Sequence, residues 1–347
     1  MKNFLTTNEA AQYYECGFSC DHAIVLVVDG EKFFITDARY TLEASEEIKN
    51  AGTSGVSVVE SDELSVTARE ILVKQGAKEC VVDPCELTYQ MLNEFIHKTP
   101  QVKFVLEDRF HQKKRSIKEQ YEIEYIKNSA KVNTEIFAKI AEFLSKNGWR
   151  RTEWDLQFTI KQFLMQFGKR ELSFEPIFAI NQNSAKPHAY PSDERLEYEG
   201  SVLLDAGIKE KRYCSDRTRT AFFGYLGLNF NTSQYFSDPE KQKIYDTVLK
   251  AHDKAIEAAR EGIAARELDA VARGVIEEAG YGKFFTHSLG HGVGLEIHEE
   301  PYINRKNEAI LQNGMVFTIE PGIYVPNFFG VRIEDMVLLK NSQAVVL

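Results

Sequence analysis

The chain has 347 residues, with 42 Lys and Arg against 52 Asp and Glu and a formal net charge of −10. Because domains commonly contain roughly 100–200 residues, this length predicts two of them. Hydrophobic residues make up 43% and charged residues 27%, which is ordinary globular usage and excludes disordered, collagen-like and coiled-coil classes. The acidic balance argues against nucleic acid and anionic membranes as partners, since both repel negative charge.

The N-terminal residues lack the continuous apolar core of a signal peptide. No segment approaches the roughly 18 consecutive apolar residues of a membrane-spanning helix. We therefore expect a cytoplasmic protein. The five cysteines include no second Cys or His pair that would complete a structural zinc site, so we expect reduced thiols.

The first part of the chain alternates strand-like and helix-like segments, which indicates an α/β domain. Residues 23–36 predict a β-hairpin in which Asp29-Gly30 forms a type I′ turn. We assign this domain to residues 1–112. Its other expected elements are strands at 56–60, 80–83 and 102–106 and helices at 63–75 and 86–97.

A second domain, residues 113–347, is predicted to begin with a long helix. Ser116 and Glu119 have capping-box spacing before an apolar pattern of helical period, which ends at Asn147-Gly148. A shorter helix is expected at 152–167. Two further helices are expected later, one from Pro239 to about residue 261 and one from there to about residue 280.

This second domain contains an internal repeat with an offset of 114 residues, because Gly148, Glu153 and Asp155 recur as Gly262, Glu267 and Asp269. Each half also has an apolar strand that ends in an acid, followed by a second acid in β-prone surroundings. If the halves pack about a pseudo-twofold axis, these four acids converge at its centre. They are Asp205 and Asp216 in the first half and Glu320 and Glu334 in the second.

Acids at the ends of apolar strands are costly to bury unless a partner or a cation compensates their charge. Three of the eight histidines lie in the glycine-rich residues 285–299, which indicates a site there. Four carboxylates with one imidazole suit Mn²⁺, Co²⁺ or catalytic Zn²⁺. Their charge would balance two divalent ions, and dinuclear sites of this kind catalyse hydrolysis.

Eight short runs occur in order over residues 116–347, namely 173–177, 183–189, 204–207, 215–220, 287–294, 297–299, 319–324 and 330–336. Together they resemble the pita-bread metallopeptidases of family M24, in the Xaa-Pro aminopeptidase and prolidase group. Residues 35–41 resemble part of their N-terminal domain. The resemblance implies an α/β N-terminal domain followed by an α+β pita-bread catalytic domain with a pseudo-twofold internal repeat.

The resemblance also implies the metal ligands, which would be Asp205, Asp216, His291, Glu320 and Glu334. Asp216 and Glu334 would bridge two divalent ions, with Mn²⁺ preferred over Co²⁺ or Zn²⁺. Glu320 would in addition act as the general base, since a carboxylate within hydrogen-bond reach of the attacking water can accept its proton.

Five residues are expected to contact the substrate in such a site. His298 would donate to the scissile carbonyl and His188 would face the leaving group. His287, Tyr324 and Arg332 would either line the proline side of the site or support the ligands.

The preferred function is an Xaa-Pro aminopeptidase, which releases the first residue of peptides that have proline second. The close alternative is an Xaa-Pro dipeptidase, and we prefer the aminopeptidase because no evident insertion closes the pocket. A methionine aminopeptidase fits less well because of the preceding α/β domain. The complete ligand set argues against a metal-free creatinase type and against a non-enzymatic pita-bread binding module. The expected partners are proline-containing peptides and a second copy of the chain in a homodimer.

Overall fold

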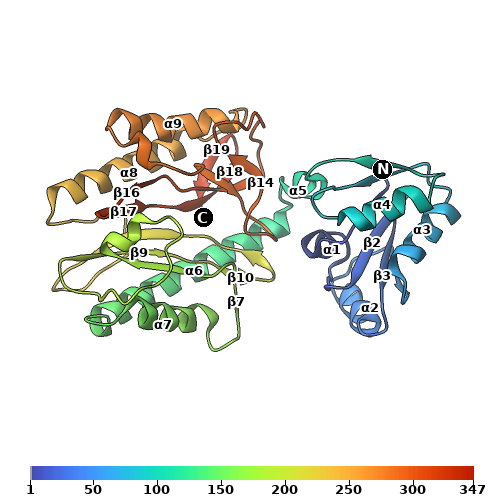
Figure 1. Cartoon of the computed structure of the whole chain (residues 1–347), viewed down its shortest axis with the longest axis horizontal. Coiled ribbons are helices and arrows are strands. Elements are labelled where there is room, and N and C mark those ends of the chain that lie inside the picture. Colours follow the sequence, from blue (N-terminus) through green and yellow to red (C-terminus); the bar gives the residue numbers. More distant parts are fainter. Residues whose placement is uncertain (1) are drawn as a thin grey trace. The chain divides into compact units, whose positions relative to one another are not determined.

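The computed structural model describes residues 2–347, and contacts divide the chain into two compact units after Arg115 (Figure 1). This division lies just beyond residue 112, the boundary that the sequence predicts. Helix α5 (Phe110–Arg115) belongs to the first unit, where the Phe110 ring packs on Phe4 with 5.4 Å between centroids. No helix among the described residues has the length and apolar character to cross a membrane.

The first unit contains a six-stranded sheet in the order β4-β3-β2-β1-β5-β6. Strand β2 runs antiparallel to both of its neighbours, whereas the other pairs are parallel. The predicted hairpin is confirmed: Asp29 has φ 50° and Gly30 has φ 91°, and a type I′ turn requires both to be positive. The strands are β1 (Phe4–Thr6), β2 (Ala23–Val28), β3 (Glu31–Thr36), β4 (Val56–Glu60), β5 (Glu79–Val82) and β6 (Lys103–Leu106).

Alternate residues of β2 point to opposite faces of this sheet and enter two different cores. Helices cover both faces. Val25 packs in the core that contains Cys16, whereas Leu26 packs in the core that contains Leu72 and Phe95. The first core is covered by α1 (Glu9–Cys16) and α2 (Thr41–Asn50), and the second by α3 (Leu64–Lys74) and α4 (Tyr89–Lys98).

The second unit is built from two halves, each with two long helices and an antiparallel sheet. In Figure 1, α8 and α9 lie along the upper side of this unit and α7 lies along its lower side. The first half has α6 (Gln120–Asn147), α7 (Glu153–Met165) and the sheet of β8 (Ile177–Ile180), β9 (Gly200–Asp205) and β12 (Thr218–Phe223). The second half has α8 (Pro239–Ala258), α9 (Ala265–Glu278) and a five-stranded sheet in the order β14-β13-β15-β18-β19.

The strands of this larger sheet are β13 (Gly290–Gly292), β14 (Glu299–Ile303), β15 (Val316–Ile319), β18 (Asp335–Lys340) and β19 (Gln343–Val346). Two smaller sheets complete the unit. One contains β7 (Glu171–Leu172), β10 (Ile208–Glu210) and β11 (Tyr213–Cys214), and the other contains β16 (Gly322–Val325) and β17 (Phe329–Arg332).

The pseudo-twofold repeat is present in the strand pairing. In the first half β9 pairs with β12, and Asp205 lies opposite Thr218. In the second half β15 pairs with β18, and Ile319 lies opposite Asp335. Each half has its own apolar core, centred on its own two helices. The acids that end or precede these strands therefore occupy equivalent places in the two halves.

The predicted start of α6 at Ser116 is wrong. The N-cap is Glu119, whose N–H donates to Glu122 Oε2 at 2.8 Å in a capping box. The preceding segment is extended because it pairs with another part of the unit. Ile117 forms a bridge with Met315, and the Lys118 N–H donates to the Gly314 carbonyl at 2.9 Å.

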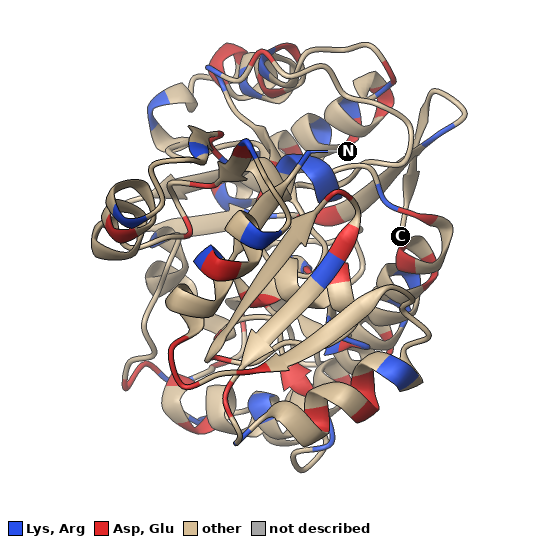
Figure 2. Cartoon of the chain, turned by 90° about the vertical axis from the view of Figure 1, so that its right-hand side faces the viewer, with Lys and Arg blue, Asp and Glu red and all other residues tan. Residues whose placement is uncertain are grey.

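Acidic and basic residues are interspersed along the helices (Figure 2), as on an ordinary solvated surface.

In the first unit, Asp83, Glu86 and His111 bring potential ligand atoms within 4.8 Å of one another. There the Glu86 Oε2 atom accepts a hydrogen bond from the Thr6 hydroxyl at 2.6 Å and lies 3.1 Å from His111 Nδ1. Protein groups therefore already satisfy this carboxylate.

Candidate metal centre

The four predicted acids meet between the two halves of the second unit. Asp205 is the last residue of β9, and Glu320 directly follows β15. Asp216 lies two residues before β12, and Glu334 directly precedes β18. All four line one cavity of about 550 Å³. The strand ends of both halves thus place their acids in a common space.

Three of these acids have an oxygen without a hydrogen-bond partner in residues 2–347. These buried atoms are Asp205 Oδ1, Asp216 Oδ1 and Glu334 Oε1. A buried carboxylate oxygen without a partner is costly, and coordination of a cation removes that cost. Asp216, Glu334 and His291 also bring ligand atoms within 4.8 Å of one another. The donor set therefore fits hard divalent cations.

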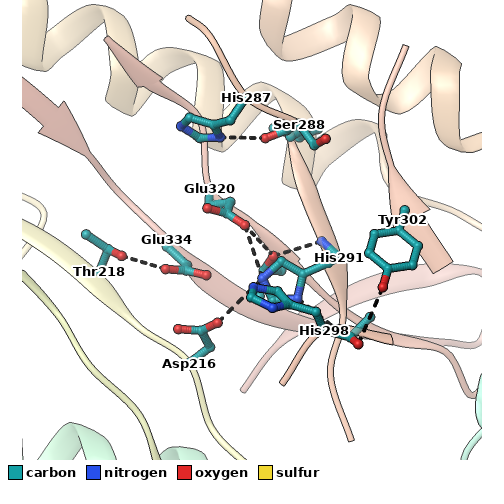
Figure 3. A network of polar contacts seen from close by, with 12 residues as sticks. Asp216, Thr218, His287, Ser288, His291, His298, Tyr302, Glu320 and Glu334 are labelled. Atoms are coloured by element: carbon teal, nitrogen blue, oxygen red, sulfur yellow. Dashed lines mark hydrogen bonds and ion pairs between the residues drawn. The ribbon is translucent and has the colours of Figure 1, made fainter. Parts of the chain in front are cut away.

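His291 directs one ring nitrogen at these acids. Its Nδ1 lies 3.1 Å from the Gly292 carbonyl, which can only accept, so Nδ1 carries a hydrogen. Its Nε2 lies 3.3 Å from Glu320 Oε1 and 3.6 Å from Asp216 Oδ2 (Figure 3). A backbone carbonyl on one ring nitrogen is a common way to orient the other toward a metal.

The buried carboxylates of this site favour the binding of cations. Burial raises the pKa of Asp216 well above its usual range, and the carboxylates of Glu334 and Asp205 raise it further. The pKa of Glu334 is raised in the same way, first by burial and then by Glu320 and Asp205. Several ionised acids cannot share this space unless protons or cations compensate them.

Arg332 lines the same cavity, and contacts with three side chains hold it in place. Its guanidinium contacts Asp205 Oδ2, donates to the Thr218 hydroxyl at 3.1 Å and donates to the Tyr324 hydroxyl at 2.8 Å. That hydroxyl lies 2.9 Å from His287 Nε2. Tyr324 is buried, and its hydroxyl is held between Arg332 and His287. These three residues form one chain of hydrogen bonds beside the acids.

His188 and His298 lie at the exposed side of the same cavity. The His298 ring contacts the His291 ring edge-on, with 4.3 Å between centroids. Apolar side chains also line the cavity, among them Phe174, Pro176 and Ile177. The cavity therefore brings acids, imidazoles and apolar surface together in a volume typical of small-ligand sites.

Comparison with known families decides the class of the protein. Residues 124–341 match the model of metallopeptidase family M24, and residues 1–117 match that of the creatinase/prolidase N-terminal domain. The chain belongs to metallopeptidase family M24. The resemblance drawn from the motifs is thereby confirmed, and so are the two-part fold and the assignment as a metallopeptidase.

This M24 metallopeptidase is similar to proteins named for Xaa-Pro substrates. It is 39% identical over 259 residues to an Xaa-Pro dipeptidase from Pyrococcus furiosus, across 74% of this chain and 70% of that protein. A solved Xaa-Pro dipeptidase from Bacillus anthracis gives a TM-score of 0.87 at 31% identity, across 99% of this chain and 92% of that one. The X-Pro aminopeptidase structure from Thermotoga maritima gives 0.84 at 29% identity, across 100% and 95%.

Two threonines that contact the acids of this M24 site were not predicted from the sequence. The Thr218 hydroxyl donates to Glu334 Oε2 at 2.6 Å, and the Thr318 hydroxyl donates to Glu320 Oε1 at 3.1 Å. Thr218 is the first residue of β12, and Thr318 lies in β15 two residues before Glu320. The sequence signal that could have indicated them is therefore their place at the strand ends that carry the acids. Outward threonines are common in strands, however, and type alone does not distinguish them.

Proposed function

We propose that this protein is a dinuclear-metal Xaa-Pro dipeptidase, which cleaves a dipeptide whose second residue is proline. The observation that carries the metal-dependent part is the three buried carboxylate oxygens, on Asp205, Asp216 and Glu334, that lack a hydrogen-bond partner among the described residues. Asp216 and Glu334 also bring ligand atoms within 4.8 Å of His291. The dipeptide part is supported by the names of the Pyrococcus furiosus and Bacillus anthracis proteins. The similarity thus favours the alternative over the aminopeptidase that the sequence alone had preferred.

The two cations would be held by the five predicted ligands, with Mn²⁺ preferred and Co²⁺ or Zn²⁺ as alternatives, since oxygen donors predominate. Bound there, they would supply Lewis acidity toward the scissile carbonyl and lower the pKa of water. The ligands are Asp205, Asp216, His291, Glu320 and Glu334.

The residues of the chain would do the remaining work. Glu320 would accept the proton of the attacking water at Oε2, because Thr318 and His291 engage Oε1. His298 would donate a ring N–H to the scissile carbonyl oxygen, and His188 would lie near the proline. Arg332 would keep Asp205 in place through the contacts described above.

The apolar wall suits a proline ring, which has no amide N–H to satisfy. Phe174, Pro176, Ile177 and Tyr190 offer such a surface in the cavity that the acids also line. A cavity of about 550 Å³ has room for a dipeptide.

The decisive experiment compares Ala-Pro with Ala-Pro-Ala as substrates of the purified, Mn²⁺-loaded protein. Hydrolysis of Ala-Pro with little turnover of Ala-Pro-Ala is the expected result. Turnover of the tripeptide alone would return the function to an aminopeptidase. Binding of both peptides without turnover would indicate a binding module. Glu320→Gln serves as the control, since it should abolish turnover.

We also propose that the protein forms a homodimer, as the resemblance implies. Light scattering coupled to gel filtration measures the mass directly. A mass of twice 39.6 kDa supports the dimer, and a mass of 39.6 kDa contradicts it.

A further inference from the structure

A buried ion pair lies next to the metal centre but outside its ligand set. Lys118 Nζ is 2.6 Å from Glu299 Oε1, and each side chain is only 1% exposed. Burying two charges costs desolvation energy, and well-packed apolar residues are often equally stable. Such a pair therefore adds little to the free energy of unfolding compared with apolar residues. Its role is better inferred from where it lies in the fold.

The Glu299 carboxylate lies inside the tight loop that joins β13 to β14. Its Oε2 accepts the N–H of Glu296 at 3.3 Å, and a Cβ at Gly294 would lie 2.4 Å from its Oε1. Glu299 also pairs with Gly292 across the two strands. The loop is thus folded closely around this single carboxylate, and Gly294 leaves the space for it.

This loop connects two of the histidines that line the cavity, His291 and His298. His291 lies in β13 and His298 directly precedes β14 (Figure 3). Among the described residues, none makes a hydrogen bond with the ring nitrogens of His298, whose carbonyl lies 3.5 Å from the Tyr302 hydroxyl. Apart from its edge-on contact with the His291 ring, the direction of the His298 ring depends on its backbone, and the next residue along is the buried Glu299.

Lys118 is itself firmly placed. Its N–H donates to the Gly314 carbonyl at 2.9 Å. A second acid, Glu122, lies close enough for both Lys118 and Glu299 to influence its pKa, which burial raises. Tyr213 donates its hydroxyl to Glu122 Oε1 at 2.9 Å. Lys118 is thus held by its own backbone beside Glu299, with Glu122 as a second buried acid nearby.

We propose that the Lys118–Glu299 ion pair is a positioning device that fixes the loop between β13 and β14 and thereby aims His298 into the substrate cavity. The pair acts through His298 and does not touch the substrate. The catalytic part of this inference rests on the proposed function of His298.

The test is a double-mutant cycle between Glu299→Gln and His298→Ala, measured as kcat and KM on Ala-Pro at full Mn²⁺ occupancy. We expect Glu299→Gln to lower kcat about tenfold or more, with a smaller change in KM. A loss of this size is expected when a proton or hydrogen-bond donor to the substrate is displaced. In the His298→Ala background the same substitution should change kcat less than twofold. Equal losses in both backgrounds would overturn the inference, because they would show an effect that does not pass through His298.

A matched control is Glu15→Gln in the first unit. Glu15 is also a buried acid, with its Oε2 3.1 Å from Lys32 Nζ and its Oε1 in contact with Lys114. Glu15→Gln should lower the melting temperature while leaving kcat on Ala-Pro unchanged. If it lowers kcat as much as Glu299→Gln does, general destabilisation explains both and the inference fails.

A second readout does not depend on turnover. Amide hydrogen exchange of residues 293–299 should accelerate in Glu299→Gln and in Lys118→Met, and should not change in Glu15→Gln. If the wild type does not cleave Ala-Pro but this loop still loosens selectively, the proposed function fails and the anchoring of the loop stands. Unchanged exchange in both variants would overturn the anchoring itself. If Glu299→Gln does not fold, the double variant Lys118→Met/Glu299→Gln, which removes both charges, takes its place in the cycle.

Discussion

Thr218 and Glu334 join the two halves of the catalytic unit although they lie 116 positions apart in the chain. The Thr218 hydroxyl donates to Glu334 Oε2 at 2.6 Å, and the Glu334 N–H donates to the Thr218 carbonyl at 3.1 Å. The second oxygen of Glu334, Oε1, has no hydrogen-bond partner in the part of the chain that the structure describes. One residue of the first half therefore orients an acid of the second half so that its free oxygen faces the site.

Thr218→Val is expected to weaken metal binding. The substitution keeps the volume but removes the donor that orients Glu334, and loss of such a supporting hydrogen bond typically costs about 10–100-fold in metal affinity. Titration with Mn²⁺ under competition by a chelator measures the change. Thr247→Val is the control, since that hydroxyl bonds only within its own helix, to the Lys243 carbonyl at 2.7 Å. Equal affinities for wild type and Thr218→Val would show that Glu334 needs no orienting donor.

Arg332→Lys is expected to lower kcat/KM on Ala-Pro at least tenfold. This corresponds to a loss of about 1.4 kcal/mol in transition-state stabilisation. The arginine contacts Asp205, Thr218 and Tyr324 at once, and a lysine has one nitrogen with which to replace that planar fork. Steady-state kinetics with parallel metal analysis checks this. Should the lysine variant match the wild type in both, the positive charge alone would explain the role of Arg332.

Removal of metal is expected to lower the melting temperature. Without cations, the buried acids repel one another and three of their oxygens lack partners. A ligand that binds only the folded state stabilises it by about 2.7 kcal/mol at 100 times its Kd, so the melting temperature should rise with added Mn²⁺. Thermal unfolding after chelation and during Mn²⁺ titration measures this. In Glu334→Gln the dependence on Mn²⁺ should be much weaker, and a melting temperature that ignores chelation in the wild type would contradict a site within the fold.

Two glycine-to-alanine substitutions are expected to act in opposite directions. A Cβ at Gly290 would lie 1.9 Å from the Thr318 carbonyl oxygen, so Gly290→Ala should push β13 from β15, destabilise the fold by roughly 1–3 kcal/mol and displace His291. Gly274 lies inside helix α9 with no atom within 4 Å of an added Cβ, so Gly274→Ala should stabilise by about 0.8–1 kcal/mol. Urea unfolding of both variants provides the measurement. A tolerated Gly290→Ala would mean that the two strands can separate without cost.

The elements with a local signature were predictable from the sequence. The type I′ hairpin, the helix that ends before Gly148 and the helix that begins at Pro239 each follow from turn or cap residues beside an apolar pattern. The four acids could be found because each ends or precedes an apolar strand and the pattern recurs in both halves. The short strand β1 and helices α1 and α2 were not predicted, since their apolar patterns are short.

Contacts between distant segments were beyond the reach of such patterns. Glu119 caps α6 in place of Ser116 because the residues before it pair with Met315, far along the chain. The Lys118–Glu299 pair spans 181 positions, and neither residue is unusual in its own neighbourhood. Residue type and spacing indicate that the acids form a site, whereas the groups that orient the site emerge only when the chain is folded.

The repeat that builds the catalytic unit is broken at one pair of strands. Strand β8 lies beside β9 in the first half as β13 lies beside β15 in the second. Ala179 of β8 pairs with Leu203, two residues before Asp205, and His291 of β13 lies beside Thr318, two residues before Glu320. The position that carries an imidazole in the second half therefore carries only a methyl group in the first, and His291 lines the cavity. A perfectly symmetric cavity would accept a peptide equally well in two opposite directions, and one of them would misplace the bond to be cut. Because the imidazole of His291 enters the cavity from one half only, the two ends of the cavity are chemically distinguishable.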